Sequence, residues 1–152
     1  MMLTLSEPAD LQMRLNYFEN RCKELGLRVT RQRQEIFRAV ASSCEHPCAE
    51  KVFEAVRTQL PNVSLDTVYR TLSSLEEMGL LMRVDVGSKA HFDADLRTHC
   101  HFICTQCGKV YDIFPQEHEE ILWPSSAQHL GEIKHVNVQL KGICKKCQQP
   151  LV

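Results

Sequence analysis

The sequence lacks a long hydrophobic run, and this absence excludes a membrane-spanning helix. No apolar stretch in the 152 residues approaches the ~20 residues that such a helix needs. The first residues, MMLTLSEPADLQ, are acidic and have no long apolar centre, so they do not resemble a secretory signal. We therefore expect a cytoplasmic protein with no membrane partner.

Internal repeats and low-complexity tracts are also absent, and neither sign of charge dominates. The net charge of −1 gives no argument for a nucleic-acid partner from bulk charge. Hydrophobic residues make up 43% and charged residues 24%, values typical of a soluble globular protein. A chain of this length forms one medium domain or two small ones.

Positive charge is nevertheless concentrated in one segment, residues 21–38. The segment carries Arg21, Lys23, Arg28, Arg31, Arg33 and Arg38, against only Glu24 and Glu35. Such a cluster is typical either of a surface that meets phosphate or of an ordinary solvated helix face. Charge alone does not decide between the two interpretations.

The first ninety residues read as helices followed by a hairpin. Apolar residues at helical spacing predict a first helix that starts at Ser6 and ends at Gly26. Thr30 is expected to cap a second helix. A third helix is expected to start near Pro47 and to stop before Pro61.

The fourth predicted helix is the most informative one. Ser64 is a good N-cap, and Gly79 suits the C-terminal cap. One face carries the apolar stripe Val68, Leu72, Leu75 and Met78. The opposite face carries side chains that can hydrogen-bond, stack or meet phosphate, namely Asp66, Thr67, Tyr69, Arg70 and Ser73.

The segment LLMRVDVGSKAHF, which follows this helix, predicts a short β-hairpin with its turn at Val86, Gly87 and Ser88. Three helices and a hairpin form the outline of a winged helix. In that arrangement the helix after the turn enters the DNA major groove, and the hairpin lies on the backbone.

From about residue 94 the composition shifts to cysteine, histidine and β-forming residues. HFICTQCGKVYDIF and IKHVNVQLKGIC read as strands, and residues 116–130 between them are expected to be helical in pieces. The predicted fold class is therefore α+β. It combines a winged helix-turn-helix domain over residues 1–92, a hinge at about 85–95, and a small α/β domain over residues 93–152.

Four of the eight cysteines form two Cys-x-x-Cys pairs, Cys104/Cys107 and Cys144/Cys147. In a reducing compartment such pairs are more typical of metal ligation than of disulfides. Each pair makes a tight turn, and two such turns complete a tetrahedral four-sulfur site. A closed sulfur shell leaves no open position, so we predict structural zinc. Redox dithiols and buried apolar thiols are the alternatives.

A second group of candidate ligands contains histidine and aspartate. His99 and His101 alternate on a predicted strand, so both face the same way. Asp93 and Asp112 lie near them in the sequence, whereas His46 by itself would be read as a helix-start or surface histidine. Imidazole and carboxylate suit Fe(II), Mn(II) or Zn(II) better than a thiophilic ion.

The succession of these motifs resembles the ferric uptake regulator (Fur) family of bacterial metal-dependent repressors. The motifs are GLRVTRQRQEIF, HPCAEKVFEAV, NVSLDTVYRTLSSLEEMGLL, HFD, HCHFICTQCGK and GICKKC. They extend from about residue 15 to residue 147, and their order is far more specific than any one of them. The resemblance implies a homodimer with an N-terminal DNA-binding domain, a C-terminal dimerisation domain that holds the structural zinc, and no enzymatic activity.

The resemblance also implies the residues of two further sites. A regulatory metal, Fe(II) or Mn(II), would sit at the hinge, with the ligands His46, Asp93, His99, His101 and Asp112. The recognition helix would cover residues 64–78 and meet double-stranded operator DNA. Its interface would include Arg31, Ser64, Thr67, Tyr69 and Arg70, with the last two closest to the DNA.

The two aspartates resemble the peroxide-responsive branch of the family, because iron-uptake members look more like glutamate at matching places. In that branch hydrogen peroxide reacts at the bound iron and oxidises a ligand histidine, which here would be His46 or His99. The oxidised site binds metal weakly and the repressor leaves DNA, whereas Mn(II) would resist this reaction. A repressor that responds to iron or zinc supply is the alternative.

Three departures from the family pattern concern cysteines and a further metal site. Cys44 and Cys48 flank His46, and we expect them to be a surface thiol and a core thiol, although they could alter metal choice or redox behaviour. Cys100 should face away from the two histidines beside it. Thr98 and Cys100 are poor ligands for the extra site of some members, although three residues keep it open: His118, Glu119 and His135.

Two function classes outside the family are alternatives. A metalloenzyme could use the histidine–aspartate cluster, but no separate general base has a clear place in the motifs. A zinc-ribbon interaction module without a DNA role is the other alternative. In such a module, unlike in a repressor, the polar face of the fourth helix would not bind DNA.

Overall fold

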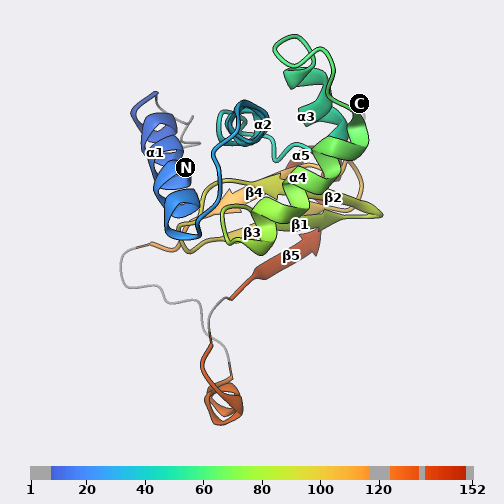
Figure 1. Cartoon of the computed structure of the whole chain (residues 1–152). Coiled ribbons are helices and arrows are strands. Elements are labelled where there is room, and N and C mark those ends of the chain that lie inside the picture. The colour runs from blue at the N-terminus through green and yellow to red at the C-terminus, as the bar shows by residue number, and fades with distance from the viewer. Residues whose placement is uncertain (1–7, 117–123, 134–135, 150–152) are drawn as a thin grey trace. The chain divides into compact units, whose positions relative to one another are not determined.

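The computed structural model describes residues 8–116, 124–133 and 136–149 and forms two compact units, Met1–Leu96 and Arg97–Val152 (Figure 1). Helices dominate the first unit and a three-stranded sheet the second, which confirms the predicted α+β fold class. Among the described residues, no helix has both the length and the hydropathy required to cross a bilayer.

The first unit contains four helices in its described part: α1 (Pro8–Glu24), α2 (Arg31–Ala41), α3 (Ala49–Val56) and α4 (Leu65–Glu77). Two predicted N-caps are confirmed. Thr30 Oγ1 accepts the backbone N–H of Arg33 at 3.2 Å, and Ser64 Oγ accepts that of Thr67 at 3.1 Å. The expected start of the first helix at Ser6 lies outside the described residues.

The hairpin pairs β1 (Met82–Val86) with β2 (Lys89–Asp93) in antiparallel register, and Val86 faces Lys89 across the turn. Gly87 adopts φ +61°, a left-handed conformation that glycine tolerates and two-residue hairpin turns require. The hairpin predicted from the sequence is confirmed.

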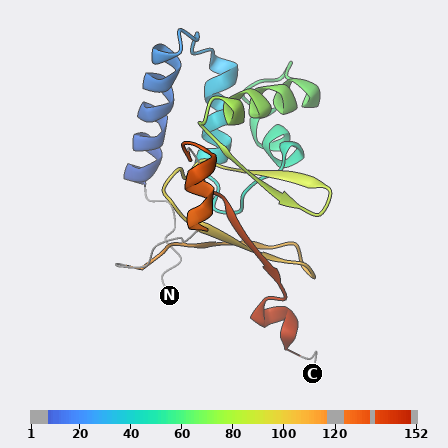
Figure 2. The ribbon, with the colours of Figure 1, turned by 90° about the horizontal axis from the view of Figure 1, so that it is seen from below.

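The loop before α3 is attached to this hairpin. Cys48 forms an antiparallel bridge with His91, and the N–H of Phe92 donates to the carbonyl of Pro47 at 3.1 Å. Figure 2 shows the four helices and the hairpin of the first unit from a second direction. The attachment places His46, at the start of the loop, beside the end of β2.

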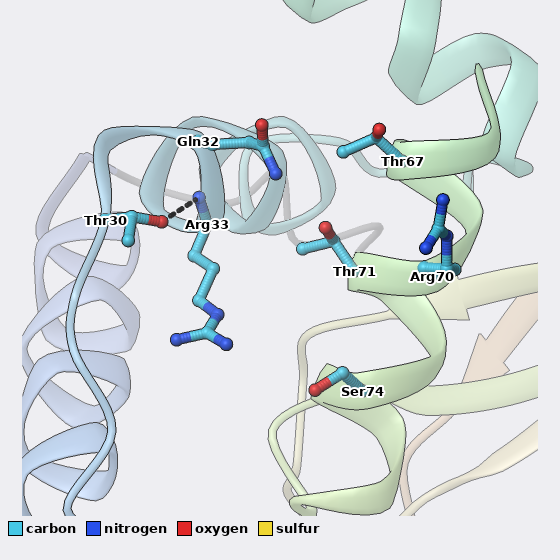
Figure 3. A pocket seen from close by; sticks show the side chains of 7 residues that line it. All are labelled: Thr30, Gln32, Arg33, Thr67, Arg70, Thr71 and Ser74. Carbon is cyan, nitrogen blue, oxygen red and sulfur yellow. Dashed lines mark hydrogen bonds between the residues drawn. The ribbon is translucent and has the colours of Figure 1, made fainter. Parts of the chain in front are cut away.

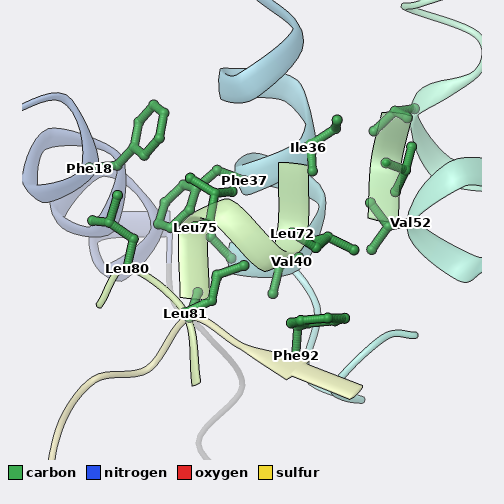
Figure 4. Packing of buried hydrophobic residues seen from close by; sticks show 14 of the residues in the cluster. Phe18, Ile36, Phe37, Val40, Val52, Leu72, Leu75, Leu80, Leu81 and Phe92 are labelled. Atoms are coloured by element: carbon green, nitrogen blue, oxygen red, sulfur yellow. The ribbon is translucent and has the colours of Figure 1, made fainter. Parts of the chain in front are cut away.

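One hydrophobic core joins all four helices to the hairpin (Figure 4). The Phe18 ring of α1 stacks on the Phe37 ring of α2, with centroids 4.7 Å apart and planes 14° from parallel. Leu72 and Leu75 of α4 are fully buried, and Phe92 of β2 is nearly so. This packing holds α4 with its apolar stripe inward and its polar face toward solvent.

The second unit is built on the sheet order β4-β3-β5, formed by β3 (Cys100–Cys104), β4 (Val110–Ile113) and β5 (Val138–Gly142). The central strand β3 pairs antiparallel with β4 and parallel with β5. A 3-10 helix, η1 (Ser125–Leu130), covers part of the segment expected to be helical in pieces, and residues 117–123 of that segment lie outside the described part. Helix α5 (Lys145–Gln148) follows β5.

Truncation of a core ring should destabilise the first unit. Phe37→Ala removes a side chain that is 1% exposed and stacked on Phe18, and we expect the free energy of unfolding to fall by about 3–5 kcal/mol. Urea unfolding followed by circular dichroism measures the loss. Met13→Ala, at a position 65% exposed, is the control and should stay within about 0.5 kcal/mol of the unmodified protein. Equal effects of the two changes would contradict the assigned core.

Candidate functional site

The four paired cysteines of the second unit converge on one point. Cys104 ends β3, Cys107 lies in the turn that follows, and Cys144 and Cys147 lie at the N-cap and inside α5. Their sulfur atoms all lie within 4.8 Å of one another, and Cys107 Sγ is 3.9 Å from Cys144 Sγ. A tetrahedral zinc with Zn–S bonds of about 2.3 Å needs sulfurs about 3.8 Å apart. The spacing therefore fits a closed zinc site.

Backbone N–H groups prepare this cluster to hold a cation. The N–H groups of Cys144 and Cys107 donate to Cys104 Sγ at 3.4 and 3.5 Å, and they lower the pKa of the Cys104 thiol to about 6. The N–H of Cys147 likewise lowers the pKa of Cys144. Cys147 donates its own thiol proton to Cys144, which raises the pKa of Cys147 to about 12. Metal binding here must therefore displace a proton.

In the first unit, His46 and Asp93 lie together although they are far apart in sequence. His46 Nε2 is 3.3 Å from Asp93 Oδ2, and both side chains are buried. His46 has φ +50°, an uncommon conformation for a non-glycine residue. Its carbonyl lies 2.6 Å from His91 Nδ1, which must carry the proton of this bond, so β2 holds the strained loop in place.

In the second unit, His99, His101 and Asp112 form another compact group. The Nε2 atoms of the two histidines are 3.0 Å apart, and they lie 3.5 and 3.4 Å from Asp112 Oδ1. Asp112 faces His101 directly across the β3–β4 pair. His99 Nδ1 lies 2.6 Å from the carbonyl oxygen of Arg97, so Nδ1 carries the proton and Nε2 presents its lone pair toward this group.

The five histidine and aspartate residues named from the family resemblance thus divide between the units, two in the first and three in the second. Imidazole nitrogen and carboxylate oxygen fit Fe(II), Mn(II) or Zn(II). Sequence reasoning from residues alone placed His99 and His101 on one face, and their 3.0 Å separation confirms this. It missed His91, for which only its place two residues before Asp93 was a signal.

The three cysteines that the family pattern does not require differ in their burial. Cys44 is exposed and Cys48 is buried, as expected for a surface thiol and a core thiol. Cys100 is half-buried at the start of β3. Of the residues that kept a further metal site open, His118, Glu119 and His135 lie outside the described residues.

The N-terminal part of α2 and the polar face of α4 border an open hollow of about 410 Å³ (Figure 3). It is lined by Thr30, Gln32, Arg33, Thr67, Arg70, Thr71 and Ser74. Two predicted interface residues, Thr67 and Arg70, are among them. The others were not predicted as interface residues. Thr30 was predicted only as an N-cap, and Arg33 belongs to the basic cluster of residues 21–38, which was the signal that pointed to phosphate.

The remaining predicted interface residues lie outside the hollow. Arg31 begins α2 and is exposed, and Ser64 shares a 2.8 Å hydrogen bond between hydroxyl groups with Thr67. Tyr69 is 42% exposed and donates its hydroxyl proton to Glu50 of α3 at 3.1 Å, which raises the pKa of Tyr69. The α4 face is therefore a polar surface whose side chains are already partly oriented.

The fold, the cysteine cluster and the polar α4 face together define a metal-binding, DNA-binding regulator. The model of the ferric uptake regulator family matches residues 24–141, and the chain belongs to this family. It is accordingly a metal-dependent DNA-binding repressor and not an enzyme.

Individual relatives agree with this assignment. The chain is 37% identical over 131 residues to the peroxide-responsive repressor PerR of Staphylococcus aureus, covering 83% of this chain and 86% of the relative. The ferric uptake regulator of Pseudomonas aeruginosa with manganese is 30% identical, with a TM-score of 0.66 and coverage of 84% and 97%. A zinc uptake regulator complexed with zinc and DNA is 26% identical, with a TM-score of 0.65 and coverage of 90% and 94%.

Loss of one cluster cysteine should release the metal of the second unit. Cys104→Ser removes the thiolate with the most backbone donors, so zinc measured by mass spectrometry should fall from one equivalent toward none, and sheet structure should be lost with it. Cys44→Ser, which changes an exposed thiol outside the cluster, should keep its zinc. Retention of zinc by Cys104→Ser would contradict the four-sulfur assignment.

The hollow should contribute contacts to DNA phosphate. Arg33→Ala removes a positive charge from its wall, so the slope of log affinity against log salt should decrease in magnitude by about one. Fluorescence anisotropy with an operator selected from random-sequence DNA measures the slope. Arg57→Ala, at an exposed arginine outside the hollow, is the control and should keep the slope.

A variant of the α4 face should behave differently from the Arg33 variant. Tyr69→Ala should lose preference for the selected operator over random DNA while the salt slope is largely kept, because base contacts rather than phosphate contacts would be removed. If Arg33→Ala and Tyr69→Ala both bind the operator like the unmodified protein, then this surface does not meet DNA. That outcome would favour the interaction-module interpretation.

Proposed function

We propose that this repressor senses hydrogen peroxide through iron held by His46 and Asp93 of the first unit together with His99, His101 and Asp112 of the second. Three nitrogens and two oxygens form a set of borderline and hard donors that suits Fe(II) and Mn(II). Within each unit the donors are already gathered, by the 3.3 Å contact in the first and by the 3.0–3.5 Å contacts in the second. Metal binding would then require little further ordering of the donor side chains within each unit.

The choice of carboxylate carries the peroxide proposal. Both acidic positions hold aspartate, which resembles the peroxide-responsive branch, and a peroxide-responsive repressor is among the relatives at 37% identity. The shorter aspartate side chain of Asp112 comes from β4 and reaches the two histidines from a fixed register opposite His101. A site with three nitrogen and two oxygen donors would leave room for a small co-ligand on the metal.

Bound Fe(II) would catalyse the cleavage of the O–O bond of hydrogen peroxide, and the two electrons of the overall reaction would come from the histidine ring. In the net reaction, one peroxide oxygen is inserted into a ring C–H bond of His46 or His99 and the other leaves as water. An oxidised ring is a poorer ligand, so the metal leaves and the affinity for DNA falls. Mn(II) in the same site would support DNA binding without this oxidation.

The repressor is proposed to act as a cytoplasmic homodimer on double-stranded operator DNA. Regulators of this family bind operator DNA as dimers. The helix α4 would enter the major groove with Tyr69 and Arg70 toward the bases. Arg70 is held by Asp66, with its Nε donating at 2.9 Å, and this pair would have to open for Arg70 to reach a base or a phosphate.

A response to metal supply is the second candidate function. The same nitrogen and oxygen donors also suit Zn(II), and the similar solved structures include a regulator with manganese and one with zinc and DNA. In that case the loss of metal to a chelator, rather than oxidation of a ligand, would release the DNA.

Peroxide separates the two candidates. Protein loaded with Fe(II) and bound to the selected operator should dissociate after a few equivalents of hydrogen peroxide. Mass spectrometry should find one added oxygen on a peptide that contains His46 or His99. Fluorescence anisotropy measures the release, and Mn(II)-loaded protein is the control that should stay bound and unmodified.

The opposite result has a clear meaning. If iron-loaded protein stays on DNA with unmodified histidines while a chelator removes it, the peroxide proposal fails and the metal-supply candidate is supported.

A further inference from the structure

Arg14 of α1 connects three parts of the first unit through one guanidinium group. Its NH2 nitrogen lies 2.8 Å from Asp10 Oδ2 and 3.2 Å from Asp95 Oδ2. Its NH1 nitrogen donates to the carbonyl of Ala41, the last residue of α2, at 3.3 Å. The Arg14 side chain is only 15% exposed and that of Asp95 only 8%. This is a largely buried ion pair rather than a surface one.

Asp95 continues the connection to the metal ligands of the first unit. Its backbone N–H donates to Asp93 Oδ1 at 2.8 Å, so one carboxylate oxygen of Asp93 is fixed by the following turn. The other oxygen, Oδ2, is thereby directed to His46 Nε2 at 3.3 Å. Contacts therefore run without a break from α1 through Asp95 to both ligands.

We propose that Arg14 is a positioning residue for the regulatory metal: it holds the segment at Asp95 so that Asp93 presents Oδ2 beside His46. The inference rests on the proposed function, in which His46 and Asp93 are metal ligands. Arg14 itself touches neither ligand and is not part of the donor set. Its effect on metal binding is exerted through Asp95.

Burial strengthens the ion pair between Arg14 and Asp95. Removal of Arg14 would take a charged hydrogen-bond donor away from the buried Asp95 carboxylate, and the loss of such a partner weakens the hold on that segment. Asp95 is the next-to-last residue of the first unit, which ends at Leu96, so little packed structure beyond it within this unit would oppose its movement. The Asp95 N–H would move as well, and Asp93 would lose its fixed orientation. Residues that orient ligands in this way commonly change metal affinity by 10–100-fold.

The test is the affinity for Mn(II) of protein that already carries its zinc, measured by isothermal titration calorimetry. Arg14→Ala should weaken Mn(II) binding about tenfold. Arg14→Lys, which can still reach Asp95 with one charge, should lie between this variant and the unmodified protein. Zinc content should be one equivalent in all of them, because the cysteine cluster belongs to the other unit.

Arg21→Ala is the matched control. Arg21 lies on the same helix and makes an ion pair with Glu24 at 3.0 Å, but its side chain is 38% exposed and the pair is local. Mn(II) affinity should be unchanged in this variant. The thermal midpoint of each variant is measured in parallel, and the titrations are made far below it, so that a loss of folded protein does not pass for a loss of affinity.

A double-mutant cycle tests whether Arg14 acts on the metal site through Asp95. Asp95→Asn should weaken Mn(II) binding, and its combination with Arg14→Ala should be little weaker than Arg14→Ala alone, since both changes disrupt the Arg14–Asp95 ion pair. Additive losses would overturn the route through Asp95. Full Mn(II) affinity in Arg14→Ala would overturn the inference as a whole.

One further variant keeps failure of the inference distinct from failure of the proposed function. His46→Ala should weaken Mn(II) binding more than Arg14→Ala does. If His46→Ala binds Mn(II) like the unmodified protein, the ligand assignment itself is wrong. If His46→Ala loses affinity and Arg14→Ala does not, the ligands are right and the role given to Arg14 is refuted.

Discussion

The central strand β3 is the constraint on which the second unit depends. Cys104 ends the strand, and its sulfur accepts two backbone N–H groups, one from the following turn and one from the start of α5. Near the other end of the same strand, His101 faces Asp112 across the β3–β4 pair. A cation in the sulfur cluster would therefore fix the strand that presents the histidines. The sulfur cluster and the His101–Asp112 pair are thus linked by a single short piece of backbone.

The local structure could be predicted because local chemistry decides it. Thr30 and Ser64 cap their helices through their own side chains, and Gly87 permits the left-handed turn of the hairpin. His101 lies on β3 as predicted, whereas His99 lies just before the strand begins at Cys100, and the two side chains still meet. The two Cys-x-x-Cys pairs carry enough information to predict that they meet, since metal ligation is the usual reason for two matched pairs.

The remaining features depend on tertiary contacts that no local pattern encodes. Only the family resemblance named His46 as a ligand, and its approach to Asp93 results from the bridge between Cys48 and His91. The hollow beside α4 was missed for the same reason. Its wall combines residues of α2 and α4 that meet only after the core has packed the two helices together.

In the first unit a single ion pair, rather than a cysteine cluster, connects distant parts of the chain. The guanidinium of Arg14 joins α1, the end of α2 and the last residues before the unit boundary. Helix α1 can in this way influence through Arg14 how the two ligands are presented. The coupling also has a direction: metal at His46 and Asp93 would favour the conformation in which Asp95 meets Arg14, because coupling between two linked sites is reciprocal. Metal binding at this site would then make helix α1 more ordered.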